Sequence, residues 1–95
     1  MDEIKIRIGI GDVVKHFKRE TLLELDKQRN KYLYRVIEIA EHTETGDLLI
    51  IYQALYSPFK TYARPVQMFC SRVDKQKYPH IKQTYRFEPL EVGFE

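Results

Sequence analysis

The strongest structural signal lies in residues 32–56, which read YLYRVIEIAEHTETGDLLIIYQALY. Residues 32–41 and 48–56 are rich in Val, Ile, Leu and Tyr, which favour β-strands. The polar segment 42–47 joins them, and its Gly46 can adopt the positive φ that a tight hairpin requires. Each strand has apolar residues at both odd and even positions, so we expect both faces of this hairpin to be at least partly covered.

Two further strands are expected before the hairpin. Isoleucine occupies every second position from Ile4 to Ile10, which is the period of a strand with one buried face. Gly11-Asp12 ends this strand over 4–10, and residues 13–17 form the second one.

Residues 19–31 read as a helical insertion between strands. Thr21 and Glu24 have the spacing of a capping box, Leu22 and Leu25 would supply a small apolar face, and Asn30 is a suitable stop. A helix of two or three turns is marginal alone, so we expect it to pack on the sheet.

The chain after the hairpin alternates turns with short elements. We expect a turn at 57–59, a strand at 61–64, a short helix or 3₁₀ turn over 65–73, a polar loop over 75–80 and a last strand over 81–87 that Pro89 ends. The apolar face of the short helix has the spacing i, i+3, i+4 and i+7, which gives Val66, Phe69, Cys70 and Val73.

These elements predict a mainly β fold with one or two short helices. A small, strongly bent sheet or a partly open SH3-like barrel fits several short strands with frequent turns. The 95 residues, 43% of them hydrophobic, suit a single domain over 1–95. The order of the strands does not follow from the sequence.

Composition excludes several classes of protein. No apolar run approaches the length of a membrane span, and the first residues, MDEIK, do not resemble a signal peptide. Cys70 is the single cysteine, so no disulfide forms within the chain, and a cytoplasmic location is expected.

The charge is uneven along the chain. Residues 57–86 carry seven Lys or Arg side chains against Asp74 alone, although the net charge of the whole chain is only +2. Such a segment can hold phosphate or another anion, or it can be no more than a solvated surface.

No set of residues requires catalysis or a metal. His42 and Glu44 form an H-x-E triplet, but the paired cysteines of a zinc deaminase are missing. His16, His42 and His80 lack the short spacing of structural zinc sites. We therefore assign no catalytic residue, metal or cofactor, and the sequence leans away from an enzyme.

Aromatic and basic residues cluster more suggestively. Tyr52, Tyr56 and Tyr62 lie close together in the sequence, and Arg64 follows them. Aromatic rings beside arginine can stack the bases of single-stranded nucleic acid and neutralise its phosphates, or they can line a groove for a protein or peptide. Tyrosine rings can also simply complete the core of a small domain.

Several short motifs occur in a fixed order over roughly residues 11–88: Gly11 to Lys18, His42 to Thr45, Tyr52 to Tyr56, Arg64-Pro65 and Met68-Phe69. Together they resemble a family of small bacterial proteins catalogued as a domain of unknown function, number sixteen fifty-three in that series. Two features depart from the family pattern. Many relatives have Trp-Val where this chain has Tyr62-Ala63, and many have a tight turn in place of the insertion 19–31.

The resemblance implies a compact, mostly β domain in a bacterial cytoplasm, and it implies no activity. It marks the following as motif positions and candidate binding residues: His16, Lys18, His42, Glu44, Tyr52, Tyr56, Tyr62 and Arg64.

Three hypotheses for the function follow. The first is a non-catalytic binding module whose aromatic and basic surface engages a protein, a nucleic acid or another anionic partner. The second is a small hydrolase or transferase that uses His42 and Glu44 with His16 nearby. The third is an accessory domain that forms oligomers, in which strand 4–10 pairs between two chains as the edge of a homodimer.

Overall fold

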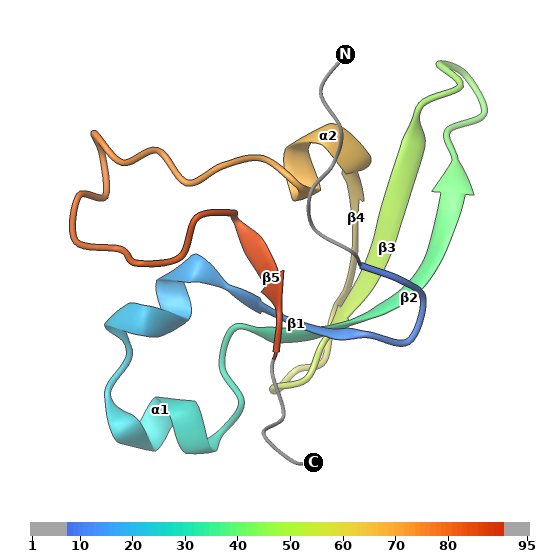
Figure 1. The fold of residues 1–95 in the computed structure, drawn as a ribbon. Coiled ribbons are helices and arrows are strands. Elements are labelled where there is room, and N and C mark those ends of the chain that lie inside the picture. The colour runs from blue at the N-terminus through green and yellow to red at the C-terminus, as the bar shows by residue number, and fades with distance from the viewer. Residues whose placement is uncertain (1–7, 91–95) are drawn as a thin grey trace, which may run out of the picture.

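A computed structural model describes residues 8–90 of the chain, and the main feature of its fold is an open, bent sheet of five antiparallel strands in the order β4-β3-β2-β1-β5 (Figure 1). The elements in chain order are β1 (Val13–His16), the 3₁₀ helix η1 (Phe17–Thr21), α1 (Glu24–Gln28), β2 (Leu33–Glu41), β3 (Leu48–Ala54), β4 (Thr61–Pro65), α2 (Val66–Phe69) and β5 (Phe87–Pro89).

The mainly β fold and its bent sheet are confirmed. The described strands do not close into a barrel, since β4 and β5 each have a partner on one side only. The SH3-like barrel, the other form of the prediction, is therefore not formed. Within residues 8–90, no helix is both long enough and apolar enough to span a bilayer.

The β2–β3 hairpin is confirmed at nearly the expected bounds. Its pairing runs from Tyr34 opposite Ala54 to Glu41 opposite Leu48, with an irregularity between Val36 and Glu38. Gly46 has a φ of 77° in the connecting turn. The core-facing side of the hairpin is buried at Val36, Ile50 and Tyr52, but Ile39 and Leu48, near the turn, remain exposed. The opposite face is only partly covered, and Ile37 at the irregularity is 40% exposed.

The core lies on one face of the sheet. Phe69 of α2 and Phe87 of β5 are stacked there, with ring centroids 4.2 Å apart and ring planes 3° apart, and both are almost fully buried. The other core members are Val14, Tyr34, Val36, Ile50, Tyr52 and Ala54. A smaller cluster joins Phe17 of η1 to Val73 and Ile81 of the segment that connects α2 to β5.

The predicted strand 4–10 falls mostly outside the described residues, which begin at residue 8. Residues 8–10 are not in a strand. They enter a turn in which the Gly9 amide donates to the Asp12 carboxylate over 2.8 Å, and Ile10 is exposed. The homodimer proposed through this strand thus rests on residues that the structure does not describe. The following strand, β1, is confirmed.

The insertion 19–31 is helical, but its predicted capping and packing are wrong. Leu23, not Thr21, is the N-cap of α1, and the Thr21 hydroxyl donates instead to the carbonyl of Lys18. No residue of α1 is buried; Leu25 is 59% exposed. Asn30 does end the helix, with a φ of 64°.

The insertion is anchored by Arg19 rather than by an apolar contact with the sheet. Its guanidinium donates to the carbonyl oxygens of Lys31 over 2.8 Å and Lys27 over 3.2 Å. Hydrogen bonds from a charged group to the last carbonyls of a helix are favourable. The sequence pattern of leucines therefore misrepresents how this segment is anchored.

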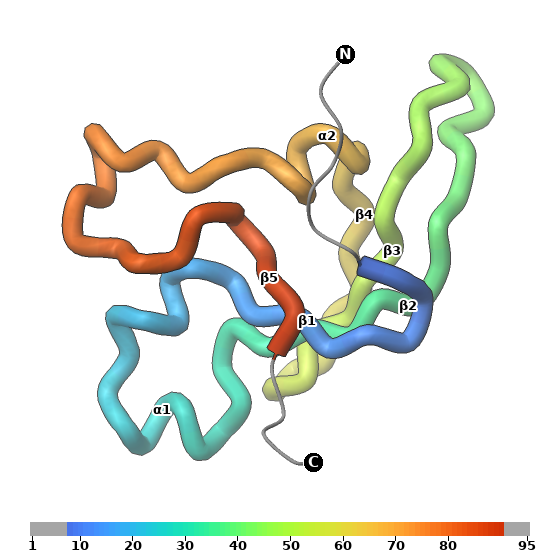
Figure 2. The backbone as a smooth tube through the Cα atoms, in the orientation of Figure 1, coloured from blue at the N-terminus to red at the C-terminus, as the bar shows by residue number. Residues whose placement is uncertain are grey.

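Residues 70–86 form less regular structure than predicted. The helix ends at Phe69 rather than at residue 73, and β5 contains only the last residue of the predicted strand 81–87. The reason is that carboxylates satisfy the backbone here. Glu20 accepts from the amides of Lys82 and Gln83, and Glu88 accepts from the amides of Thr84 and Tyr85. The tube in Figure 2 shows this segment running beside residues 17–21.

Candidate functional site

Two adjoining hollows open on the core-bearing face of the sheet. We call the first the aromatic hollow; its volume is about 190 Å³, and its walls include Tyr32, Tyr34, Tyr52, Tyr62 and Phe87. We call the second the basic hollow; its volume is about 430 Å³, and its walls include Lys18, Arg64, Lys77 and Arg86. His16, Lys18 and Arg64 line both hollows, so the two form one continuous site.

Strand register places the tyrosines of the aromatic hollow on one face. Tyr52 pairs directly with Tyr62 across β3 and β4, and paired residues in antiparallel strands point to the same face. The ring centroids of Tyr52 and Tyr62 are 5.5 Å apart, and Tyr34 of β2 lies edge-on to both. Tyr34 and Tyr52 are buried, while Tyr62 is 39% exposed. Tyr62 therefore presents a supported ring at the mouth of the hollow.

The phenol hydroxyls beneath this surface have defined partners. The hydroxyls of Tyr34 and Tyr56 are 2.8 Å apart, and the hydroxyl of Tyr52 accepts from Nε of Arg64 over 3.2 Å. Burial, together with the bond to Tyr56, raises the pKa of Tyr34. Burial also raises the pKa of Tyr56. These two phenols are thus protonated at neutral pH, and Tyr52 holds Arg64 at the boundary between the hollows.

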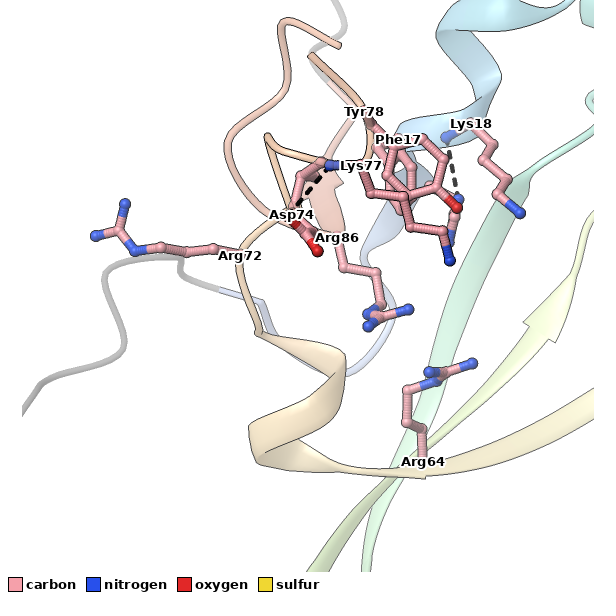
Figure 3. Close-up of a pocket in the computed structure, with 10 residues that line it drawn as sticks. Phe17, Lys18, Arg64, Arg72, Asp74, Lys77, Tyr78 and Arg86 are labelled. Carbon is pink, nitrogen blue, oxygen red and sulfur yellow. Dashed lines mark hydrogen bonds between the residues drawn. The ribbon is translucent and has the colours of Figure 1, made fainter.

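The cations of the basic hollow come from three separate parts of the chain. Lys18 belongs to η1, Arg64 to β4, and Arg86 to the residue before β5. Figure 3 shows the guanidinium groups of Arg64 and Arg86 pointing toward each other across the hollow, whereas Arg72 points away. Nε of Arg86 donates to the hydroxyl of Ser71 over 3.2 Å. Both arginines therefore meet neutral oxygen atoms through Nε and direct their other N–H groups toward the opening.

The nearby carboxylates are occupied by the backbone. Asp74, the acidic residue of the basic hollow, accepts from the amides of Gln76 and Lys77. Glu20 and Glu88 cap the amides of residues 82–85. The acidic groups closest in sequence to these arginines thus serve local structure, and the hollow keeps its positive potential.

His16 lies where the two hollows meet. Its Nδ1 accepts from the backbone amide of Lys18 over 3.1 Å, so the neutral ring carries its proton on Nε2. Burial, followed by the charges of Arg86, Lys18 and Arg64, lowers the pKa of His16 from 6.5 to about 4. At neutral pH His16 is therefore an uncharged hydrogen-bond donor surrounded by cations.

The depressed pKa of His16 predicts a pH dependence of stability. Between pH 6.5 and about 4 the unfolded chain binds a proton that the folded protein does not, so the free energy of unfolding falls as the pH decreases through this window. Lys18, Arg64 and Arg86 are the charged groups that face the ring. We expect His16→Asn, which keeps an acceptor near Nδ1, to flatten this dependence in urea denaturation series.

The matched control is His80→Asn at an exposed histidine. It should leave the slope of stability against pH in that window unchanged. An NMR titration of His16 that gives an ordinary histidine pKa would contradict this interpretation.

The structure brings five of the eight predicted site residues into the walls of the aromatic hollow: His16, Lys18, Tyr52, Tyr62 and Arg64. Tyr56 lies beside them through its bond to Tyr34. The sequence did not single out Arg86. In the sequence Arg86 is one of seven basic residues in 57–86 and nothing distinguishes it from the others. It joins the site only because β5 pairs with β1, which places residue 86 beside residue 17.

His42 and Glu44 lie elsewhere. They belong to the turn after β2, where Nδ1 of His42 accepts from the backbone amides of Glu44 and Thr45. The amide of His16 bonds to the carbonyl of Tyr32, at the other end of β2. A strand of nine residues separates these ends by about 30 Å. The structure therefore does not bring together the three groups that a His16–His42–Glu44 site would need.

Two other candidates add nothing to this site. Cys70 is half-buried, and burial raises the pKa of its thiol, which disfavours the reactive thiolate. Within residues 8–90, no three His, Cys, Asp or Glu side chains are grouped so that they could hold a metal ion.

Comparison with known proteins gives one match. A family model described as "Protein of unknown function (DUF1653)" matches residues 12–89, a range that includes every residue of both hollows. No curated protein and no solved structure matches the chain.

Proposed function

Since this chain belongs to the DUF1653 family of proteins of unknown function, we propose a function from its own geometry: it is a small binding module that holds a phosphate-bearing ligand in the basic hollow. The observation that carries the proposal is the convergence of Lys18, Arg64 and Arg86 on the neutral His16. No chemical step is part of the proposal, and a cytoplasmic location stays a prediction.

The hydrogen-bonding geometry of the basic hollow suits phosphate. A guanidinium that has used Nε still offers four N–H groups, and two facing guanidinium groups can each bind phosphate oxygens in a bidentate manner. Lys18 adds a point charge, and Nε2 of His16 adds a neutral donor. Three cations placed around one opening repel each other, so a bound anion relieves their repulsion as well as forming hydrogen bonds.

The experiment that tests this proposal is a calorimetric titration of the protein with inorganic tripolyphosphate, begun at low salt and repeated as salt is added. We expect saturable binding that weakens as salt is added. Arg86→Gln should weaken it by about tenfold or more, because hydrogen bonds to charged groups typically contribute about 1.5–3 kcal/mol. Thermal denaturation of the variant checks that its fold is intact.

Arg35→Gln is the matched control, since it makes the same change in charge on the opposite face of the sheet. Arg35 is exposed and donates to the carbonyl of Gly11. Its variant should bind tripolyphosphate like the unmodified protein. The proposal is wrong if tripolyphosphate does not bind saturably, or if the two variants lose affinity equally.

A further inference from the structure

A phosphate bound in the basic hollow leaves the aromatic hollow beside it without a ligand. We infer that the ligand is a nucleotide unit, whose base stacks on Tyr62 in the aromatic hollow while its phosphate binds Arg64, Arg86 and Lys18 in the basic hollow. This inference rests on the proposed function and names the class of ligand. The base and the phosphate of a nucleotide are joined through one sugar, and the two hollows are joined through three shared residues, His16, Lys18 and Arg64.

Tyr62 has the properties of a stacking platform. The residue is 39% exposed although it belongs to a regular strand, and its neighbours on the side of the core are rings. Tyr52 lies 5.5 Å away at a plane angle of 32°, and Tyr34 meets it edge-on at 6.2 Å. A ring supported in this way loses little side-chain freedom when a base stacks on it. Stacking on aromatic rings is also a common way to bind single-stranded nucleic acid.

Arg64 connects the two halves of the proposed ligand site. Its Nε is fixed to the hydroxyl of Tyr52, the residue that pairs with Tyr62 across β3 and β4, and its guanidinium points into the basic hollow (Figure 3). A base over Tyr62 is therefore adjacent to the first cation. Arg86, on the far side of the basic hollow, is placed to contact the same phosphate or the next one along a strand.

The pattern of charge and aromatic surface favours a nucleotide over an acidic peptide. A peptide carboxylate would satisfy the arginines but would leave the exposed ring of Tyr62 without a flat partner. The walls of the aromatic hollow are mostly rings, and a ring can stack on any base because every base has a flat π-face. We therefore expect binding with little base preference.

The decisive comparison uses two strands with equal numbers of phosphates. A fluorescent oligomer of four thymidines is titrated beside an abasic oligomer of the same length and charge. If a base stacks in the aromatic hollow, the thymidine strand should bind about 5- to 150-fold more tightly, the range expected for stacking one base on an aromatic side chain. This measurement uses the unmodified protein, so it does not depend on how any variant folds.

Variants locate the effect. Tyr62→Ala should reduce the affinity for the thymidine strand to that of the abasic strand and leave the affinity for tripolyphosphate unchanged, whereas Tyr62→Phe should keep the difference. Phe59→Ala is the matched control. Phe59 is a second exposed aromatic residue, at 55%, but it lies in the turn before β4 and outside the walls of the hollow. Its loss should change neither affinity.

Each outcome separates the two proposals. Equal binding of both strands, with tripolyphosphate still bound, overturns the nucleotide inference and leaves the proposed function intact. Failure of tripolyphosphate to bind overturns both. A tetraglutamate peptide that binds as tightly as the thymidine strand overturns the inference in favour of a protein partner. Competition with free thymidine 5′-phosphate then distinguishes two kinds of nucleotide ligand. If it displaces the thymidine strand at a similar concentration, the ligand is a free nucleotide. If it does not, the ligand is a single strand.

Discussion

Replacement of Phe87 by Ala is expected to lower the free energy of unfolding by about 3–5 kcal/mol, the usual range for a buried phenylalanine. Phe87 is 1% exposed, and its ring stacks on Phe69 at 4.2 Å. It also meets the rings of Tyr34, Tyr52 and His16 edge-on. The substitution therefore creates a cavity surrounded by four aromatic rings, and rigid rings collapse poorly into such a space.

The size of this loss matters because small proteins have little stability in reserve. A domain of this length is stable by about 5–15 kcal/mol, so the variant should be close to unfolding at moderate temperature. Urea denaturation measures the change. Leu23→Ala is the control, since Leu23 is 78% exposed and its truncation should change stability by less than about 0.5 kcal/mol. A loss below about 1 kcal/mol for Phe87→Ala would contradict the described core.

The second large effect is expected for Glu20→Ala, which should lower the free energy of unfolding by about 2–3 kcal/mol. The carboxylate of Glu20 accepts from the amides of Lys82 over 2.8 Å and Gln83 over 2.7 Å. Gln83 is buried, so its amide would lose a charged acceptor with no ready access to water. Hydrogen exchange should show the amides of residues 82 and 83 losing protection, besides the shift in the urea midpoint.

Loss of protection confined to other residues would argue against this role of Glu20. Glu44→Ala provides the comparison, because Glu44 is an exposed glutamate in the turn between β2 and β3. Its replacement should leave both the urea midpoint and the exchange of residues 82 and 83 unchanged. If the two glutamate variants were equally destabilised, a general effect of charge would explain both.

The hairpin could be predicted from the sequence because its determinants are local. Strand period, β-forming residues and Gly46 all lie within one stretch of 25 residues, 32–56, and the register of β2 and β3 follows from the turn. The sequence also assigned Tyr52 to one strand and Tyr62 and Arg64 to another, and it grouped these residues by their nearness in the chain. That the two strands are neighbours is shown by the structure, because the order of the strands does not follow from the sequence.

The rest of the candidate site could not be predicted, because it depends on contacts between distant parts of the chain. The amides of Lys82 and Gln83 donate to Glu20, which lies 62 and 63 residues earlier in the chain. No periodic pattern in the sequence predicts these two bonds. The same bonds explain the wrong strand at 81–87, since a backbone that finds carboxylate acceptors needs no neighbouring strand. Arg86 reaches the site only through this arrangement.

The pairing of β1 with β5 has a consequence for how the protein is made. β1 lies between β2 and β5 in the sheet, so one of its edges stays unpaired on the ribosome until residues 87–89 have been synthesised. Phe87, the centre of the aromatic cluster, and Arg86, one wall of the basic hollow, emerge at the same late moment. Folding of the core and assembly of the ligand site are thus coupled to the synthesis of residues 86–89, and a nascent chain that has not reached residue 86 has neither.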